Sequence, residues 1–592
     1  MSTLPAMETK EKFETIVFST PSYSTSSQNF INSEHQAAAS SINQKLAPDV
    51  KDCGLLIHSL ANTAITNDKA RFGFHIAAVK FDCAFLSTSV LSAFAKACSF
   101  VGRILREYGG NDKSDDKEGE LIVKDSRSGN TYNVPIRKGS VDAMQFRQMV
   151  TTSKFSTMLG KPVKGQLKVL DVGYQNTACA ESNITFVLVV PITQSTSSIL
   201  TNPSDGENGK ILFRGHNILD LHRDRSFDDV AYLLMWGALP RKDQLAHFRE
   251  EFARLANPPQ NVIDTINGFS RDSPAYLMIT AGLSAWAAAV PGQIPVHVGE
   301  TLYLKNPKMA DISMKQGFAS FAAIVALIYC HQHGHAFTPA EGHRSLPENV
   351  LLMMHFVDKL TGKPAPAMIE ELDKLLILYA DHEMTASTAA LLHTGSVGAD
   401  ALTSLISSVA TGWGPLHAGA IDLVYKKLEE IGSVENVEPF IEKVRNKEQR
   451  LMGVGHRLYR TQDPRGKLLR DRLLELSLGV EAIPLLAVAL EIERVVSIDE
   501  YFTSRKLCIN ADLYGSLVFT ALGFEKEIIT AVAGIGRCAG ALAHWKEAAS
   551  KELNPMKSLL GDSDNITDKD PKIWRPTQLY TGPMSVGQED GD

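Results

Sequence analysis

From about residue 224 almost to the end of the chain, apolar residues recur at the i, i+3, i+4 spacing of amphipathic helices. Segments such as "FDDVAYLLMWGALP", "GFASFAAIVALIYCHQHG" and "PAMIEELDKLLILYADHE" show this spacing, and Gly or Pro residues separate them. No internal repeat typical of a solenoid is found. The spacing therefore predicts a mainly α fold.

Short strands are expected before this helical part. The segment "ELIVKDSRSGNTYNVPI" sets Leu121 and Val123 against Tyr132 and Val134 around a polar turn, which predicts a β-hairpin. A second strand pair, "ESNITFVL" and "KILFRGHNI", is interrupted by a Ser/Thr/Pro-rich insert at residues 188–206. Such an insert costs little, because the entropy of loop closure grows slowly with loop length.

Size and charge set further limits. The chain has 592 residues, enough for two domains, with 44% hydrophobic residues and a net charge of −7, which argues against a general nucleic-acid binder. No uninterrupted apolar run reaches the length of about eighteen residues that a membrane span needs, so no membrane partner is expected. The seven cysteines lack CxxC spacing, so neither a disulfide framework nor a zinc knuckle is expected.

The two ends of the sequence bear on the compartment. The first thirty residues contain Glu8, Glu11 and Glu14 but no arginine, which is unlike a mitochondrial presequence, and "GQEDGD" is not a peroxisomal tripeptide. We expect a cytoplasmic protein, with mitochondrion and peroxisome as alternatives. Residues 1–118 begin Ser/Thr/Asn-rich and show no chemistry, so they are interpreted as an N-terminal extension.

Two histidines follow helix breaks in glycine-rich surroundings. His417 stands in "GWGPLHAGA" after an apolar helical run, and His456 stands in "MGVGHRLYRTQDPRG" after a polar run. The segment after His456 is rich in arginine, which suits carboxylate or phosphate, although a charge run is usually a solvated face. Together with Asp512 in "NADLYG", these residues indicate acid, base and anion-binding groups.

Two other motifs are weaker indications of a site. "CHQHGH" would aim His331, His333 and His335 one way if extended, as a metal site might require, but a helix end followed by a polar loop is the simpler interpretation. "GIGRCAG" resembles a phosphate-binding loop, yet it lies inside a helical pattern and not after a strand.

The chain resembles the citrate synthase family in the order and spacing of "YADHEMTAST", "GPLHAGA", "MGVGHRLYRTQDPR", "NADLYG", "GRCAGALAHW" and "IWRPTQLYTG". The resemblance covers about Glu120 to Gly582 without the insert, and the GHR…DPR segment alone is highly specific. It implies a citrate synthase-like two-domain helical fold, with a small N-terminal β-hairpin region and the extension.

The domain bounds follow from the same resemblance. A large helical domain would comprise residues 119–416 plus 521–582, and a small mobile domain, residues 417–520, would close on the substrates. Residues 583–592 would form a tail. The family also implies a homodimer in which each site is completed by the neighbouring chain.

The implied reaction is a Claisen-type condensation: an acyl-CoA loses an α-proton, its carbon attacks the ketone of oxaloacetate, and the thioester is then hydrolysed. By resemblance, Asp512 removes the proton, His417 donates a hydrogen bond to the thioester oxygen, and His456 protonates the ketone oxygen. His417 must then be neutral, which we expect from the positive end of the helix that follows it.

The resemblance also assigns binding residues. His382, His456, Arg465 and Arg537 would hold oxaloacetate, because buried carboxylates require paired cations. Arg575 would reach in from the partner subunit, and Arg460 would contact the CoA phosphates. No metal and no cofactor is implied, and the partners are small-molecule substrates.

Three acyl-pocket positions depart from the family pattern. Ala533 stands four residues before Arg537 where many members have Phe, Gly515 stands where Ser is frequent, and Ala418 replaces a Gly. Loss of a Phe ring makes room for several methylenes, each worth about 0.8 kcal/mol when buried. We therefore hypothesise a 2-alkylcitrate-forming enzyme of specialised or secondary metabolism, which uses a longer acyl-CoA.

Three alternatives were weighed against this hypothesis. If a neighbouring side chain refills the space, the chain is a housekeeping citrate or 2-methylcitrate synthase that uses acetyl- or propionyl-CoA. A catalytically inactive relative is disfavoured because the catalytic positions are retained. An ATP-dependent citrate lyase is disfavoured because its nucleotide-binding modules have no counterpart here.

Overall fold

The computed structural model describes most of the chain after Lys117, within one compact unit that starts at Glu118. The described residues are 119–152, 164–188, 210–304, 306–456, 459, 463–477, 483, 485–550 and 573–579. The predicted extension, nearly all of the predicted insert, Arg460 and the tail at 583–592 lie outside these residues, so the expectations for them stay predictions.

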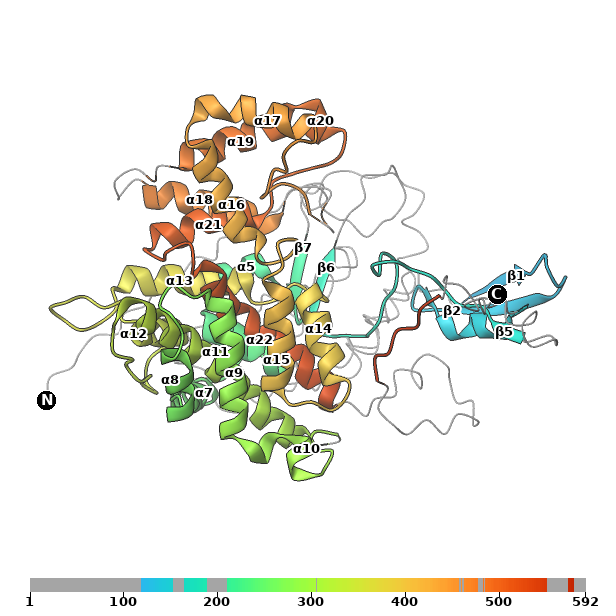
Figure 1. The fold of residues 1–592 in the computed structure, drawn as a ribbon, viewed down its shortest axis with the longest axis horizontal. Helices are drawn as coiled ribbons and strands as arrows, with labels where there is room; N and C mark the ends of the chain where they lie inside the picture. Colours follow the sequence, from blue (N-terminus) through green and yellow to red (C-terminus); the bar gives the residue numbers. More distant parts are fainter. Residues whose placement is uncertain are drawn as a thin grey trace, which may run out of the picture. The chain divides into compact units, whose positions relative to one another are not determined.

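Short antiparallel strands precede the helices, as predicted (Figure 1). Strands β1 (Gly119–Lys124) and β2 (Thr131–Arg137) form the expected hairpin, with Leu121 opposite Val134 and Val123 opposite Tyr132. Strand β3 (Ser140–Val141) extends this sheet, and β4 (Val150–Thr152) pairs with β5 (Lys164–Gln166). A short 3₁₀ helix, Ala143–Gln148, lies between β3 and β4.

The second predicted strand pair is also present. Strand β6 (Thr185–Leu188) pairs with β7 (Lys210–Phe213), and β7 pairs with β8 (His216–Asn217). Leu188, assigned to the insert from the sequence, is the last residue of β6.

Helices form nearly all of the rest, which confirms the mainly α prediction (Figure 1). The first group comprises α5 (Ile218–Asp224), α6 (Phe227–Trp236), α7 (Lys242–Leu255), α8 (Gln260–Asn267), α9 (Ala275–Ala289), α10 (Pro295–Val298), α11 (Pro307–His333), α12 (Leu346–Met353), α13 (Pro366–Tyr379), α14 (Ala386–Gly395), α15 (Ala401–Gly412) and α22 (Ile529–Ser550). Many begin at a side-chain cap: Ser226 and Asp229 form a capping box at the start of α6, and Thr385 caps α14.

Helix α11 is the centre of the hydrophobic core. It packs against α7, α9, α15 and α22, and eighteen consecutive residues near its end are almost all buried. Among the described helices, α11 alone is long and apolar enough to cross a membrane. However, 83% of its most apolar 18-residue stretch is buried inside the structure. This burial is typical of a core helix.

Helix α22 packs closely because it is rich in small residues, as its sequence predicts. A methyl group at Gly536 would approach the carbonyl oxygen of Leu376 in α13 to 2.8 Å, and one at Gly534 would approach the Phe321 ring in α11 to 3.1 Å. The three helices can therefore contact each other through backbone and ring atoms. This packing fixes the end of α13, where the candidate site begins.

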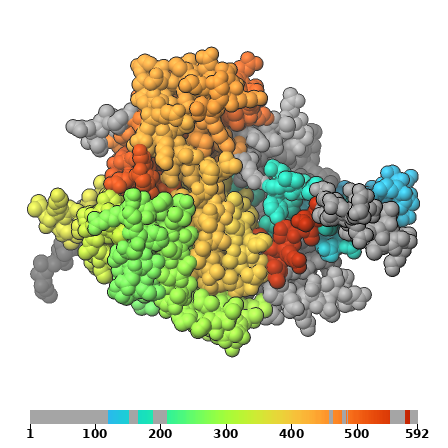
Figure 2. Space-filling model, viewed as in Figure 1, coloured from blue at the N-terminus to red at the C-terminus, as the bar shows by residue number. Residues whose placement is uncertain are grey.

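The remaining helices pack mainly among themselves. They are α16 (Ala420–Ile431), α17 (Val437–Arg445), α18 (Pro464–Ser477), α19 (Leu486–Ile498), α20 (Glu500–Thr503) and α21 (Ala511–Ala521). Two 3₁₀ helices, Pro291–Gln293 and Val434–Asn436, complete the described elements. The orange residues of α16 to α20 form one contiguous group of side chains (Figure 2). Their bounds resemble those of the predicted small domain, whose mobility stays a prediction.

Candidate active site

His417 lies in the loop between α15 and α16, as the Gly and Pro residues around it predict. Its Nε2 accepts a hydrogen bond from the backbone N–H of Ser387 at 3.2 Å and lies 2.8 Å from the Ser387 hydroxyl. A nitrogen that accepts from a backbone N–H carries no proton, so the neutral ring is protonated at Nδ1. The imidazole is thereby prepared to donate through Nδ1.

Burial, assisted by Arg537, lowers the pKa of His417 to about 4. The imidazole is therefore neutral at physiological pH, as the sequence analysis expected, but the main cause is different. Helix α16 begins only at Ala420, whereas the helix that contacts the ring is α14, through the N–H of Ser387 in its first turn. Desolvation and this N–H donor, more than the dipole of α16, oppose protonation.

A short backbone bridge joins the segments that carry His456 and Asp512. Val454 pairs with Ile509, the N–H of Gly455 donates to the carbonyl oxygen of Cys508 at 2.7 Å, and the Asn510 side chain donates to the Gly455 carbonyl oxygen at 3.0 Å. His456 directly follows this bridge on one segment. Asp512 follows it on the other, in the first turn of α21.

Asp512 combines partial burial with nearby cations. Burial raises the pKa of its carboxyl to about 6, although Arg465 and Arg537 act in the opposite direction. Its own N–H donates to the side chain of Asn510 at 2.9 Å, which caps α21 and fixes the backbone at this point. A carboxylate with a pKa near 6 is ionised at neutral pH and is more basic than an exposed aspartate.

The His456 ring is held by two neighbours. Its Nδ1 accepts the backbone N–H of Tyr459 at 3.2 Å, so the proton of the neutral ring is on Nε2. The Tyr459 ring stacks on it with the centroids 4.4 Å apart, and the Tyr459 hydroxyl lies 2.9 Å from Nε2 of His382. The rings of His382 and His456 are in turn 5.2 Å apart, edge to face.

His382 is buried in a turn between α13 and α14. Burial lowers its pKa well below the usual value, and Arg465 and Arg537 lower it further. The preceding Asp381 accepts the N–H of Glu383 at 3.1 Å and lies 3.2 Å from Nε2 of the buried His544. Burial raises the pKa of Asp381, but His544 and Arg537 outweigh this effect and bring the pKa to about 2.

Arg465 is buried and held by a bidentate pair with Asp463, with Nε to Oδ1 at 3.1 Å and Nη2 to Oδ2 at 2.8 Å. Asp463 also accepts the N–H of Ala511 at 3.2 Å. The pair therefore connects the start of α18 with the start of α21, and it raises the pKa of Arg465 despite the burial. The guanidinium is fixed beside Asp512.

Arg537 is a positively charged side chain close to several of these groups. It is an electrostatic neighbour of His382, His417, Asp512 and Arg465, from its position on α22. Burial lowers its pKa to about 10, so it stays charged at neutral pH, and its buried Nη1 has no hydrogen-bond partner among the described residues. A buried cationic donor without a partner suits an anionic ligand.

The three acyl-pocket positions differ in surroundings. Ala533 is buried on the same face of α22 as Arg537, because the two are four residues apart, and Ala418 is exposed beside His417. Gly515 is in contact with the hydroxyl of Tyr379, which would overlap any side chain placed there. Of the three, Ala533 is the buried position at which a small side chain stands where the resemblance leads one to expect Phe, so it is the candidate for a wider pocket.

Of the two remaining binding residues predicted from the resemblance, the structure describes only Arg575. Arg460 lies outside the described residues. Arg575 is exposed on the segment 573–579, which is attached to its own chain through Trp574, whose N–H donates to Ser396 at 3.1 Å. Its predicted entry into the site of a partner subunit stays a prediction.

The disfavoured metal motif is a helix end. His331 and His333 belong to the last turn of α11, where they contact the carbonyl oxygens of Phe269 and Tyr329. Within the described ranges, no group of three His, Cys, Asp or Glu side chains could hold a metal ion. The glycine-rich "GIGRCAG" lies inside α22, as expected.

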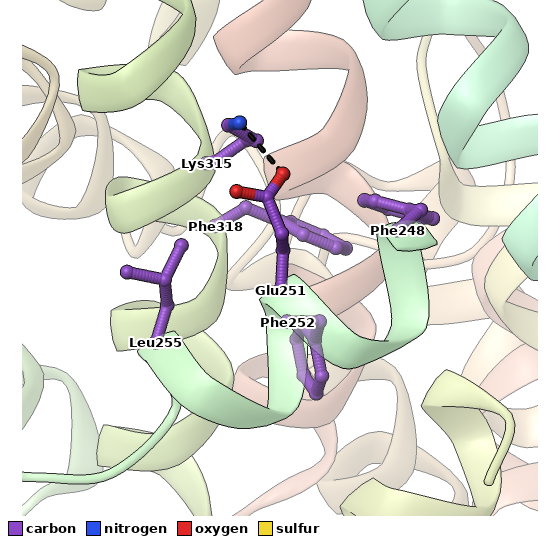
Figure 3. A pocket seen from close by; sticks show the side chains of 6 residues that line it. All are labelled: Phe248, Glu251, Phe252, Leu255, Lys315 and Phe318. Atoms are coloured by element: carbon purple, nitrogen blue, oxygen red, sulfur yellow. Dashed lines mark hydrogen bonds and ion pairs between the residues drawn. The ribbon is translucent and has the colours of Figure 1, made fainter. Parts of the chain in front are cut away.

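Several described arginines of the basic run after residue 443 are paired within the protein. Arg445 binds Asp499, Arg470 lies 3.2 Å from Glu493, and Arg472 pairs with Glu371. A hollow between α7 and α11 is lined by phenylalanines and bridged by the Lys315–Glu251 ion pair at 2.7 Å (Figure 3). It contains none of the predicted site residues.

Several supporting residues were not predicted from the sequence: Ser387, Tyr459 and Asp463. Each lies within five residues of a predicted one, inside the quoted motifs. Their polarity or aromatic character was visible, but their hydrogen-bond partners come from distant parts of the chain. The only feature of the sequence that could have identified these residues is their proximity to a predicted site residue.

Comparison with known proteins gives matches over most of the chain. Residues 173–576 match the family model "Citrate synthase, C-terminal domain". A citrate synthase-like protein from Aspergillus oryzae, oryE, is 38% identical over 80% of this chain and 98% of its own length. An alkylcitrate synthase from a fungal species, phiJ, is 34% identical over 79% of this chain and 95% of its own.

Other matches concern compartment and fold. A glyoxysomal citrate synthase of Cucurbita maxima and a peroxisomal one of Arabidopsis thaliana are 34% and 33% identical. The structure of Thermoplasma acidophilum citrate synthase, in a ternary complex with carboxymethyl coenzyme A and oxaloacetate, superposes with a TM-score of 0.57. It covers 70% of this chain and 97% of its own at 24% identity. The fold, the matched model and the relatives agree: the chain belongs to the citrate synthase family and is a citrate synthase-like enzyme.

Proposed function

We propose that the chain condenses an acyl-CoA longer than propionyl-CoA with oxaloacetate and hydrolyses the thioester, which yields a 2-alkylcitrate. The observation that carries the proposal is the cluster of a neutral imidazole, a basic carboxylate and two buried guanidinium groups around His382 and His456. This combination meets the needs of a thioester enolisation next to a bound dicarboxylic keto acid.

The first step is removal of the acyl α-proton by the ionised carboxylate of Asp512. This carbon acid is too weak for a carboxylate alone, so charge that develops on the thioester oxygen must be stabilised. His417 supplies the hydrogen bond through Nδ1–H, because its Nε2 accepts from Ser387. A low pKa keeps His417 neutral before and during this step.

In the second step the enol carbon attacks the ketone carbon of oxaloacetate, and the ketone oxygen takes a proton from Nε2 of His456. Arg465 and Arg537 bind the two carboxylates together with His382, and the orphan Nη1 of Arg537 provides a donor. Water then cleaves the thioester and releases CoA as a thiol. Metal and cofactor have no part in this proposal.

Other parts of the proposal follow from the family resemblance. Arg460 contacts the CoA phosphates, and Arg575 completes the site of a second copy in a homodimer. Helices α16 to α21 form the mobile small domain, and its closure excludes water from the enol intermediate. We also propose the cytoplasm as the compartment, with the peroxisome as the alternative that some relatives' names support.

The longer acyl group rests on Ala533. Its small side chain lies on the Arg537 face of α22, and the relatives include an alkylcitrate synthase from a fungus. A second candidate, condensation of acetyl- or propionyl-CoA, is favoured by Tyr379, whose hydroxyl fills the space beside Gly515. Secondary metabolism would follow from the first candidate, and housekeeping metabolism from the second.

Steady-state kinetics with acetyl-, propionyl-, hexanoyl- and decanoyl-CoA separates the two candidates. Thiol release is followed with oxaloacetate present and absent, at saturating oxaloacetate. The proposal predicts the highest kcat/KM with hexanoyl- or decanoyl-CoA. A highest kcat/KM with acetyl-CoA contradicts it and supports the second candidate, whereas no oxaloacetate-dependent release with any acyl-CoA indicates an inactive relative.

A further inference from the structure

The hydroxyl of Tyr379 is a buried donor that the proposed reaction does not use. Tyr379 is the last residue of α13, its side chain is 8% exposed, and its ring lies 5.8 Å from that of Phe519 in α21. The hydroxyl has no hydrogen-bond partner in the described part of the chain. A buried hydroxyl without a hydrogen bond destabilises the state in which it occurs, so a partner is expected in another state of the protein.

Gly515 defines where this hydroxyl lies. A methyl group added to Gly515 would overlap the Tyr379 oxygen, while the nearest atom of another residue, Cδ1 of Leu469, would be 3.7 Å away. Gly515 is three residues after Asp512 on α21, and side chains at this spacing are neighbours about 5–6 Å apart on one helix face. The Tyr379 oxygen therefore lies beside Asp512.

The charges around the hydroxyl are those of the candidate site. Asp512 raises the pKa of Tyr379 in addition to the larger effect of burial, while Arg465 and Arg537 lower it. The groups that interact electrostatically with Asp512 come from four elements: Tyr379 in α13, Asp422 in α16, Asp463 and Arg465 at the start of α18, and Arg537 in α22. Among these, Tyr379 is the neutral donor.

We propose that Tyr379 is a positioning residue for Asp512: in the substrate-loaded site its O–H donates a hydrogen bond to the Asp512 carboxylate. The glycine at 515 makes this possible. Where the resemblance leads one to expect Ser, the chain has no side chain, and a hydroxyl from α13 occupies the space instead. A hydroxyl group therefore still lies next to Asp512, but it belongs to Tyr379 in α13 and not to a serine in α21.

The inference rests on the proposed function, and it is tested by its effect on the pKa of the catalytic base, Asp512. A donor to the ionised carboxylate lowers its pKa, so removal of the hydroxyl raises the pKa of Asp512. In Tyr379→Phe we expect the acid limb of the pH profile of kcat/KM for acyl-CoA to move up by about one unit. We also expect kcat to fall about tenfold, as for one lost hydrogen bond of about 1.4 kcal/mol, with an unchanged KM for oxaloacetate.

A matched control is Tyr232→Phe in α6, which also removes one phenolic hydroxyl and whose ring contacts Trp236 and Phe248. It should leave the profile unchanged. An unmoved acid limb in Tyr379→Phe would overturn the inference, as would a loss confined to the KM for oxaloacetate, which would assign the hydroxyl to the keto acid. A wild type without oxaloacetate-dependent turnover overturns the proposed function as well.

The position of the Tyr379 hydroxyl beside Gly515 can be tested by thermal unfolding, without an activity assay. Gly515→Ala alone should lower Tm, because its methyl group overlaps the Tyr379 oxygen. In the double variant Tyr379→Phe, Gly515→Ala this oxygen is gone, and most of the lost Tm should return. If the two changes lower Tm additively, the hydroxyl does not occupy the space beside Gly515, and the inference fails.

Discussion

Replacement of Asp512 by Asn should make the substrate-free protein more stable at neutral pH while it abolishes turnover. The folded pKa of Asp512 is about 6 against an ordinary value of 3.8, a difference of about two units. At 1.36 kcal/mol per unit, ionised Asp512 costs the folded state about 3 kcal/mol above pH 6. Loss of a favourable charge in the first turn of α21 offsets about 0.3–1 kcal/mol, which leaves about 2 kcal/mol.

The stability difference between wild type and Asp512→Asn should depend on pH in one direction. Because the folded pKa is raised, wild type loses stability relative to the variant as pH rises from about 4 to about 6, and the difference is constant above that range. Thermal unfolding of both proteins between pH 4 and pH 8 should show coincident Tm values at the acid end and a higher Tm for Asp512→Asn at pH 8.

Asp499 offers a control of opposite sign. It caps α20, and Arg445 outweighs the effect of burial and lowers the pKa of its carboxyl. Asp499→Asn should therefore lower Tm at neutral pH. The reasoning about Asp512 is refuted if Asp512→Asn is less stable than wild type at pH 8, or if the Tm difference does not vary with pH.

Three further predictions concern single contacts. Ala533→Phe should close the pocket and reduce kcat/KM for hexanoyl-CoA about 100-fold or more relative to acetyl-CoA. The reason is that the four additional methylenes of the hexanoyl group, at about 0.8 kcal/mol each, lose their binding site. If competition assays show an unchanged ratio of the two kcat/KM values, Ala533 does not line the pocket. Arg465→Lys should raise the KM for oxaloacetate at least tenfold, because lysine cannot reproduce the bidentate pair with Asp463 that positions the guanidinium, and an unchanged KM would remove Arg465 from the binding set. Gly540→Ala should destabilise the protein by about 1–3 kcal/mol in thermal unfolding, because the methyl group would overlap the Asp381 side chain; a wild-type Tm would show that α22 can shift away.

The fold was predictable where local patterns agree with the final packing. The alternation of Leu121 and Val123 against Tyr132 and Val134 predicted the first hairpin, and the 3.6-residue spacing predicted the helices. Strands of two or three residues, such as β3 and β5, carry too little pattern to be recognised. Their existence depends on contacts with neighbouring strands.

The site was predictable as a set of motifs but not as a network. The helix breaks marked His417 and His456, yet the tautomer of His417 depends on Ser387, which arrives from another helix. The neutral state was expected from the dipole of the following helix, whereas burial is the first cause. Burial and long-range hydrogen bonds are tertiary properties, and a linear pattern does not contain them.

The central claim is that Asp512, His417 and His456 act on one bound pair of substrates. It is tested most directly by thiol release from acyl-CoA with and without oxaloacetate, in wild type and in Asp512→Asn, whose folding is verified by its Tm. The account predicts oxaloacetate-dependent release by wild type and a loss of at least 100-fold in the variant. Equal release by both proteins, or release by wild type that is independent of oxaloacetate, would contradict it.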